Sequence, residues 1–475
     1  MSSTAASASV GSDSGGSSDG GETGTVPGGP GCGFASAAFC ETFDAPSDHR
    51  GRAVELDARR WSAARGNPQL ATGNGRAIAA GPATITDCRN DLPSQVFPDQ
   101  DTLVCDANDD IASPHLLMAV GAQNYGQNSY RIRQPFDFEG RTGTIVFDAE
   151  GYVLNGLLGW ISLEITEDPT PLPSFAILGN DEGGPVPRNG MQVQFQASCP
   201  GQLGSVGVRF IDVSSNYHDE VFPGPEFTCV AGAKGKLNHF EVRVSQQHVE
   251  VYGSPYADDG VSFEPAVLLH AVDVALPFSR GWVHLTTHNH ATIKYSQDDA
   301  YGATEVIDAW VTRWDNVGFD GPVIDGGREF EVGDALVAGT DAWNIPGPVM
   351  DVGYRVPDFA DATPLTLTMP GVDASGMGRA RLAVSMWYLL GQDVPHEQYV
   401  LHYRVNEHGW HERSFDADEL ALLATGLIQG ELGQMLELPV DELQAGDNTL
   451  QFATSGVPQS YPPAISAIDL VLAPG

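Results

Sequence analysis

The chain of 475 residues is poor in basic side chains: 24 Lys and Arg stand against 62 Asp and Glu, which gives a net charge of −38. Only three of the cations are lysines, namely Lys234, Lys236 and Lys294. Such a surface repels phosphate backbones and anionic lipids, which argues against a nucleic-acid-binding or anionic-membrane-binding protein. The sequence also lacks an apolar run of about 18 residues, so it predicts no transmembrane segment.

Glycine and proline, in contrast, are abundant, with 55 and 32 residues. Turn formers at this density favour many short strands over long helices. From about 33 to 322 a dozen segments alternate apolar and polar residues, and a second set of such segments follows. We therefore expect an all-β chain with a sandwich over 32–322, a linker over 323–336, a smaller sandwich over 337–475, and one helix over 418–428 capped by Asp416 or Asp418.

Residues 1–31 consist mainly of Ser, Gly, Asp and small residues, and they predict a disordered tether. No charged segment and apolar core of a signal peptide precede them, so the sequence is that expected of a mature form. A tether of this kind is typical of bacterial lipoproteins, which predicts an extracellular or cell-surface protein with a lipid anchor on the native N-terminus. The alternative is an ordinary disordered tail.

All six cysteines lie in the first half of the chain, and no two have C-x-x-C spacing. An even number in a secreted protein favours disulfides, although fifteen pairings are open. We expect sequential pairing, because each pair then flanks a plausible loop: Cys32–Cys40, Cys88–Cys105 and Cys199–Cys229. The alternative is six reduced core cysteines in a cytosolic protein.

Three segments, FCETFD (39–44), NHFEVRVSQQHVEVYGS (238–254) and RWDNVGFDGP (313–322), resemble the concanavalin A-like lectin/glucanase superfamily. The resemblance covers about 34–322 and implies a concanavalin A-like β-sandwich, or jelly roll. LPVDELQAGDNTLQF (438–452) resembles galactose-binding-like or jelly-roll accessory domains, which implies a second, smaller β-sandwich. These motifs mark strands of the fold, so they say more about fold than about function.

Strand 159–168, GWISLEITED, has two contrasting faces. Alternation places Ile161, Leu163 and Ile165 on the apolar face. The polar face carries Trp160, Ser162, Glu164, Thr166 and Asp168. Glucanases of the superfamily carry a Glu-x-Asp-x-Glu strand, so the resemblance implies Glu164 and Asp168 as catalytic carboxylates, although Thr166 replaces the central Asp. The alternative is a strand whose acids face water.

Strand 280–290, RGWVHLTTHNH, places four side chains on the face opposite Val283 and Leu285: Trp282, His284, His288 and His290. Histidines spaced in this way bind sugar hydroxyls, chelate zinc, or act as acid and base, a role for which we select His288. Lys294 follows the strand and extends the same rim. A plain polar strand face is the alternative.

Further ligand-binding candidates come from neighbouring segments: Arg131, Trp314 and the loop residues Asn124 and Tyr125. If these polar faces share one concave sheet, their aromatic plates and hydrogen-bonding groups fit sugar rings. Acid-rich loops at 106–110, 258–260 and 296–302 suggest a structural calcium ion, with solvated loops as the alternative. Calcium is favoured over zinc as cofactor. Four histidines cluster in the second half, namely His396, His402, His408 and His411, and three of the four are interpreted as surface residues.

The leading hypothesis is an extracellular or surface-tethered carbohydrate-active protein that binds a polysaccharide on the concave face of its first sandwich. One alternative is a glycoside hydrolase or polysaccharide lyase that uses Glu164 and Asp168 or the histidine strand. Another is a non-catalytic adhesion or structural protein. The sequence leaves open whether the second sandwich covers the polar face of the first.

Overall fold

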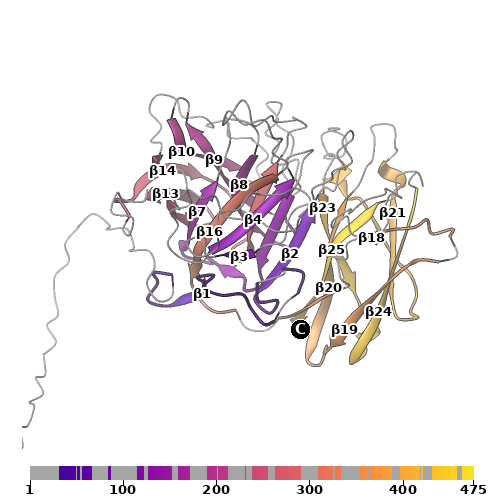
Figure 1. Cartoon of the computed structure of the whole chain (residues 1–475). Helices are drawn as coiled ribbons and strands as arrows, with labels where there is room; N and C mark the ends of the chain where they lie inside the picture. Colours follow the sequence, from indigo (N-terminus) through magenta and orange to yellow (C-terminus); the bar gives the residue numbers. More distant parts are fainter. Residues whose placement is uncertain are drawn as a thin grey trace, which may run out of the picture.

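The computed structural model describes residues 32–49, 51–53, 56–66, 84–86, 115–121, 127–151, 159–171, 190–199, 202–211, 230–231, 238–254, 263–289, 309–324, 327–332, 354–361, 363–387, 396–417, 419–420, 431–456 and 463–475. Within these residues the strands form four sheets in which every strand pair is antiparallel. The predicted all-β fold class is confirmed. In Figure 1 the indigo-to-salmon strands form the first sandwich, and the orange and yellow strands form the second beside it.

The first sandwich consists of two eight-stranded sheets. The one that we call the β7 sheet has the order β14 (Val267–Asp273), β13 (His248–Ser254), β12 (Asn238–Val244), β7 (Gly143–Gly151), β16 (Ala309–Asp320), β4 (His115–Gly121) and β3 (Thr84–Thr86), with β1 (Ala37–Glu41) on β16. The β8 sheet has the order β11 (Val230–Ala231), β10 (Gln202–Ile211), β9 (Gly190–Cys199), β8 (Gly159–Thr166), β15 (Arg280–Asn289), β5 (Gln127–Ile132) and β2 (Trp61–Gly66), with β6 (Phe136–Asp137) on β15.

Aromatic side chains join the two sheets across the core. Phe195 of the β8 sheet lies 4.6 Å from Phe240 and 5.3 Å from Phe147, both of the β7 sheet, measured between ring centroids. Trp61 and Trp314 are fully buried in the same cluster. Since burial of each large apolar side chain contributes about 1.5–3 kcal/mol, this face-to-face contact is the main source of stability of the first sandwich.

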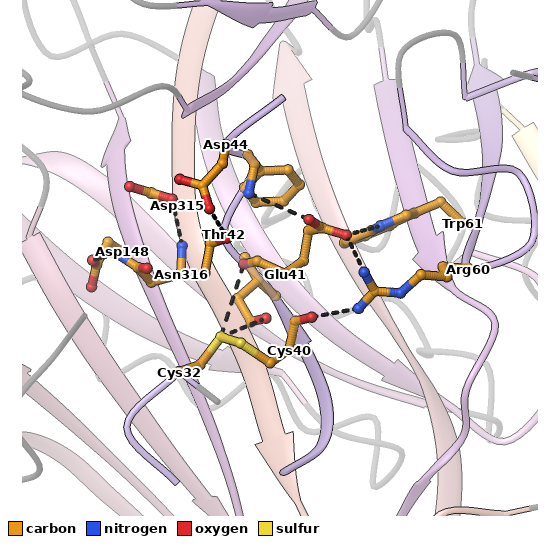
Figure 2. Close-up of a disulfide and its surroundings, with 12 residues drawn as sticks. Cys32, Cys40, Glu41, Thr42, Asp44, Arg60, Trp61, Asp148, Asp315 and Asn316 are labelled. Atoms are coloured by element: carbon orange, nitrogen blue, oxygen red, sulfur yellow. Dashed lines mark hydrogen bonds and ion pairs between the residues drawn. A yellow bond between two sulfur atoms is a disulfide. The ribbon is translucent and has the colours of Figure 1, made fainter. Parts of the chain in front are cut away.

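The N-terminal strand β1 pairs with β16, and a disulfide joins Cys32 to Cys40 at this point (Figure 2). This predicted pairing is confirmed. Cys88, Cys105 and Cys229 lie outside the described residues, and only the backbone of Cys199 is described, so the other two pairings stay predictions.

The second sandwich consists of two smaller sheets around its own apolar core. The β25 sheet has the order β17 (Arg328–Glu331), β25 (Ala464–Pro474), β20 (Met377–Trp387) and β23 (Glu431–Leu438), with β18 (Tyr354–Arg355) on β25. The β24 sheet has the order β19 (Leu365–Val372), β24 (Gly446–Ser455), β21 (Val400–Val405) and β22 (His411–Ser414). Two short 3-10 turns, η2 (His396–Gln398) and η3 (Val440–Glu442), complete the described elements.

Part of the predicted linker is a strand. Phe330 and Val332 pack on the second core, whereas Glu329 and Glu331 point to arginines of the first sandwich. The strand was missed because its two acids were read as loop residues, although they alternate with apolar side chains. The predicted domain bounds otherwise stay predictions.

The start of the predicted helix is capped as expected. The amide of Glu419 donates to Asp416 Oδ1 at 2.8 Å, and the amide of Asp416 donates to Glu419 Oε2 at 2.7 Å, a reciprocal capping box. The rest of 418–428 lies largely outside the described residues. Among the residues that are described, no helix has the length and apolar character that crossing a membrane requires.

Candidate functional site

One row of polar residues crosses the β8 sheet. The register places five residues side by side on consecutive strands: Gln192, Glu164, His284, Arg131 and Ser62. Their strand neighbours form the core on the opposite face, as alternation requires. All five are nevertheless buried. Because buried polar groups need hydrogen-bond partners, the contacts within this row define what each residue does.

Glu164, the predicted catalytic carboxylate, is held by its neighbours on the sheet and is 0% exposed. Its Oε1 accepts a hydrogen bond of 2.8 Å from Gln192 Nε2 and one of 3.3 Å from Ser162 Oγ. The carboxylate therefore has a fixed orientation. The sequence signal for this contact is the alternation of Gln192, Gln194 and Gln196, which predicts a polar stripe on the same face, although Gln192 was not singled out among them.

His284 is buried in a chain of hydroxyl groups. Its Nε2 lies 2.8 Å from Thr166 Oγ1, and its Nδ1 lies 3.3 Å from Ser129 Oγ. Since the Thr166 hydroxyl donates to the backbone oxygen of Asp168, it accepts from Nε2–H, which leaves Nδ1 to accept from Ser129. Burial, followed by the charge of Arg131, holds the pKa of His284 well below its usual value. The imidazole is thus neutral with a defined tautomer.

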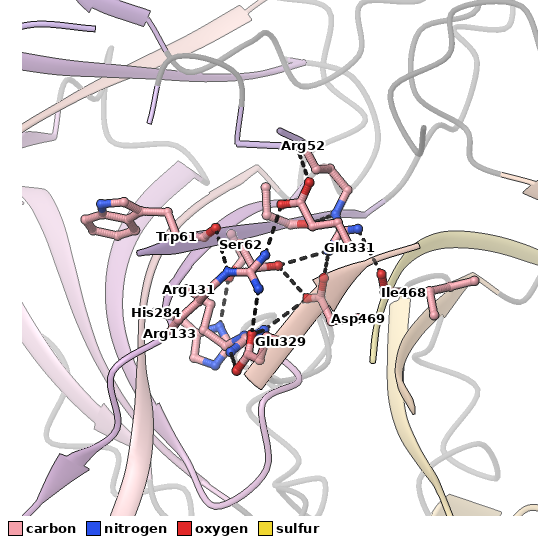
Figure 3. Close-up of polar contacts among 12 residues, drawn as sticks. Arg52, Trp61, Ser62, Arg131, Arg133, His284, Glu329, Glu331, Ile468 and Asp469 are labelled. Atoms are coloured by element: carbon pink, nitrogen blue, oxygen red, sulfur yellow. Dashed lines mark hydrogen bonds and ion pairs between the residues drawn. The ribbon is translucent and has the colours of Figure 1, made fainter. Parts of the chain in front are cut away.

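Arg131, predicted to bind a ligand, instead binds the second sandwich (Figure 3). Its Nη1 and Nη2 each donate to Glu329 at 2.9 Å, and Nη2 lies 3.0 Å from Asp469 Oδ2. Burial lowers the pKa of Arg131, but the two carboxylates raise it more, so the net shift is upward. This assignment was wrong because a polar residue on a strand face has the same pattern whether a ligand or a distant segment covers it.

Asp469 of β25 is the centre of this buried ion cluster. Arg52 and Arg131 both pair with it, and Ser62 Oγ donates to it. Burial alone would raise the pKa of Asp469. The positive charges of Arg52, Arg131 and Arg133 lower this pKa by more, so the net shift is downward. The ion pairs join the β2 and β5 end of the polar row to the β25 sheet.

Two further contacts dock the sandwiches together. Asp168 Oδ1 accepts from Arg381 Nη1 of β20 at 2.8 Å. Thr170 lies directly against Gly433 of β23, where an added Cβ would come within 2.4 Å of the threonine Cβ. Since β2 also contacts β20 and β25, the second sandwich covers one end of the polar face. Asp168, predicted as the second catalytic carboxylate, therefore lies at the interface.

The remaining candidate site residues lie on β15, on β8 or outside the described residues. Trp282 faces away from the core, as predicted from Val283 and Leu285, but it is half-buried and its Nε1 has no hydrogen-bond partner among the described residues. The register pairs His288 with Trp160, whose side chains are not described. Four candidates lie outside the described residues: Asn124, Tyr125, His290 and Lys294.

Trp314, predicted to bind a ligand, is a core residue instead. It is fully buried in the first core on β16, which belongs to the other sheet. A bulge between Asp315 and Gly318, with Asn316 at φ 48°, shifts the strand by one residue. Strict alternation along this strand would place Trp314 on the face opposite Val317 and Phe319, and the bulge moves it to the same side as these two residues.

No metal site is visible in the described part of the chain, where no three His, Cys, Asp or Glu residues converge in a way that could hold an ion. The acid-rich loops at 106–110, 258–260 and 296–302 lie outside that part. A buried group that sequence reasoning missed lies on the outer face of the β7 sheet: His239 Nδ1 is 2.6 Å from Asp148 Oδ1, and Asn316 donates to Asp148 Oδ2 at 2.7 Å. Calcium and zinc stay predictions.

No protein-family model matches the sequence, and no curated protein matches it. Solved structures similar to the chain include the β-glucanase of Bacillus licheniformis, with 12% identity over 61% of this chain and 100% of that one and a TM-score of 0.29. Lectin II from Ulex europaeus has 8% identity over 59% and 99%, with a TM-score of 0.31. Endo-β-1,4-glucuronan lyase from Trichoderma reesei has 9% identity over 45% and 83%, with a TM-score of 0.28.

Likeness at these TM-scores says nothing about function, and the fold assignment rests on the strand order and the core. The resemblance of the second sandwich to galactose-binding-like domains stays a prediction.

Proposed function

We propose that the protein is a carbohydrate-active protein that binds a polysaccharide on the polar face of the β8 sheet. The observation that carries the proposal is the row of Gln192, Glu164 and His284 on a sheet face that the core does not use. Gln192 fixes the orientation of Glu164, and the hydroxyl groups of Thr166 and Ser129 fix that of His284. Rigid planar hydrogen-bonding groups beside aromatic plates suit sugar hydroxyls and ring faces. The second sandwich covers the edge of the sheet formed by β2 and β5. The glycan therefore binds where β8 begins and β15 ends, at the positions of Trp160 and His288.

An extracellular or cell-surface location, with a lipid anchor on the native N-terminus, belongs to this proposal. The Cys32–Cys40 disulfide supports it, because disulfides persist in oxidising compartments. The Ser- and Gly-rich residues 1–31 suit a tether between an anchor and the first sandwich.

The test is a depletion assay with a panel of insoluble polysaccharides, in which wild-type protein is compared with Trp282→Ala and His288→Ala. We expect at least one polysaccharide to deplete the wild type and both variants to bind more weakly at an unchanged melting temperature. His248→Ala, a half-exposed histidine on the β7 sheet, is the matched control and binds like the wild type. Binding by neither wild type nor variants contradicts the proposal.

A second candidate is cleavage of the bound glycan, which the fixed orientation of Glu164 favours. Retaining hydrolysis needs two carboxyl groups roughly 5–5.5 Å apart. Asp168, the partner expected from the sequence, is paired with Arg381, so Glu164 is the residue to test. An assay for new reducing ends, or for the ultraviolet absorbance of unsaturated products, separates the two: a catalyst loses product formation in Glu164→Gln, whereas a binder forms no product in either protein.

A further inference from the structure

A cluster of aromatic side chains lies on the second sandwich, on the outer face of the β24 sheet. Phe359 is 42% exposed, whereas large apolar side chains are usually buried. His402 stacks on it with ring centroids 3.9 Å apart and planes at 23°. Trp410, half-buried, meets it edge-on at 5.3 Å. Because His402 covers one face of the Phe359 ring, the opposite face is the one that remains open to water.

This exposed ring is held rigidly. The Phe359 amide donates to the Thr454 oxygen at 2.7 Å, and the Thr454 amide donates to the Pro357 oxygen at 2.8 Å. His402, which supports the ring from below, is buried, and its Nε2 lies 2.9 Å from Ser455 Oγ. An aromatic plate that is already ordered loses little conformational entropy when a ligand stacks on it.

Arg404 of β21 adds a positive charge beside this plate. Its guanidinium carbon lies 4.6 Å from the Trp410 ring centroid, and its Nε donates to Gln451 Oε1 at 2.6 Å. Among the arginines whose side chains the structure describes, Arg404 alone has no carboxylate within ion-pair distance. In a chain with a net charge of −38, an arginine without a carboxylate partner is the exception. No described residue accepts a hydrogen bond from its two terminal nitrogens, so these are the donors offered to a ligand.

We propose that Phe359, Trp410 and Arg404 form a second glycan site, which binds a uronic-acid residue of an acidic polysaccharide. The apolar face of the pyranose ring stacks on the open face of Phe359, beside Trp410. Its carboxylate accepts hydrogen bonds from the terminal nitrogens of Arg404, a geometry in which two parallel N–H···O bonds are favoured. The proposal rests on the proposed function only in assuming a glycan as ligand; it assigns a different surface and a different sugar chemistry.

The experiment is isothermal titration of the full chain with oligogalacturonate, oligoglucuronate and oligomannuronate, and with the carboxyl-reduced form of each. We expect at least one oligouronate to bind and its reduced form to bind at least tenfold more weakly. Phe359→Ala and Arg404→Gln each weaken binding at least tenfold. Arg379→Gln is the matched control, because Arg379 is an exposed arginine of the same sandwich that pairs with Glu437 on the other sheet. Melting temperatures establish that the variants are folded.

Three results overturn the inference: none of the oligouronates binds, the reduced form binds as well as the acid, or folded Arg404→Gln binds like the wild type. His288→Ala separates this inference from the proposed function. Oligouronate binding that is lost in Phe359→Ala and retained in His288→Ala supports the second site whatever the first sandwich binds. The reverse pattern refutes the second site and supports binding by the first sandwich.

Discussion

At the β2 and β5 end of the β8 sheet the outward polar side chains are buried and bonded to the second sandwich, whereas on the outer face of the β24 sheet Phe359, Trp410 and Arg404 remain in contact with water. Arg131 and Arg404 illustrate the difference. Both are arginines on strand faces turned away from a core, yet Arg131 has two carboxylate partners and Arg404 has none among the described residues. What covers a sheet face, rather than its residue types, decides whether an arginine serves structure or recognition.

Among the described residues, the second sandwich therefore docks on the first through one of its two sheets. Its β25 sheet supplies Asp469, Arg381 and Gly433 to the contact with the first sandwich. Its β24 sheet carries the aromatic cluster. Buried ion pairs and close packing thus join the two sandwiches, and the comparison can be tested by weakening these contacts.

The largest effect is expected from Asp469→Ala. The substitution leaves Arg52 and Arg131 buried without their shared carboxylate, and breaking a buried ion pair in this way costs about 3–5 kcal/mol. Denaturant unfolding should show this loss in the free energy of unfolding. Glu437→Ala, which removes the partner of exposed Arg379, is the control and should change it little. Equal effects of the two substitutions would mean that Asp469 does not hold the sandwiches together.

A smaller effect is expected from Gly433→Ala. The new methyl group would meet the Thr170 side chain across the interface, and overpacking of this kind costs about 1–3 kcal/mol. Gly409→Ala is the control, because nothing lies within 4 Å of its added methyl group. Thermal unfolding should show a lower melting temperature for Gly433→Ala alone. If both variants melt like the wild type, the Thr170 contact is loose.

Strand faces of the first sandwich were predictable from the sequence. Alternation places Ile161, Leu163 and Ile165 toward the core, and all three are buried there, as are Val283 and Leu285. Period-two patterning fixes these faces because a slip of one residue would expose the whole apolar set. The partner of the opposite face was not predictable, since Asp469 lies more than three hundred residues away in sequence and pairs with Arg131 only through tertiary structure.

Three features of the structure were predicted wrongly or missed, each for a physical reason. The bulge at Asn316 reverses the side on which Trp314 lies, and no pattern in RWDNVGF marks the extra residue. In β17, Glu329 and Glu331 read as loop acids because their arginine partners lie far away in sequence. The exposed cluster around Phe359 was missed because Phe359 lies far in sequence from His402 and Trp410 and meets them only in the folded chain.

The stability of the first sandwich should fall as the pH drops below about 6.5. Burial holds the pKa of His284 well below that value, so the folded state stays unprotonated where the unfolded state takes up a proton. Stability from this group is fully present above the unfolded pKa and is lost toward the folded pKa, by about 1.4 kcal/mol per pH unit. Unfolding of wild type and His284→Gln at pH 7, 6 and 5 gives the difference in slope. Identical slopes would mean that His284 has the same pKa in the folded and the unfolded state.

A further loss of stability, from Asp469, is expected below about pH 4, because its pKa is also lowered.

The smallest effect on stability is expected from Phe359→Ala, and this is what separates a recognition surface from a core. The ring is partly exposed, so its removal costs mainly the stacking on His402, about 0.5–1 kcal/mol. Phe147→Ala is the matched comparison, since the same substitution in the first core costs about 3–5 kcal/mol. Denaturant unfolding measures both. A loss of several kcal/mol in Phe359→Ala would show that the ring is there to shield His402. The face of the β24 sheet would then resemble the β2 and β5 end of the β8 sheet, where the polar residues are covered for stability.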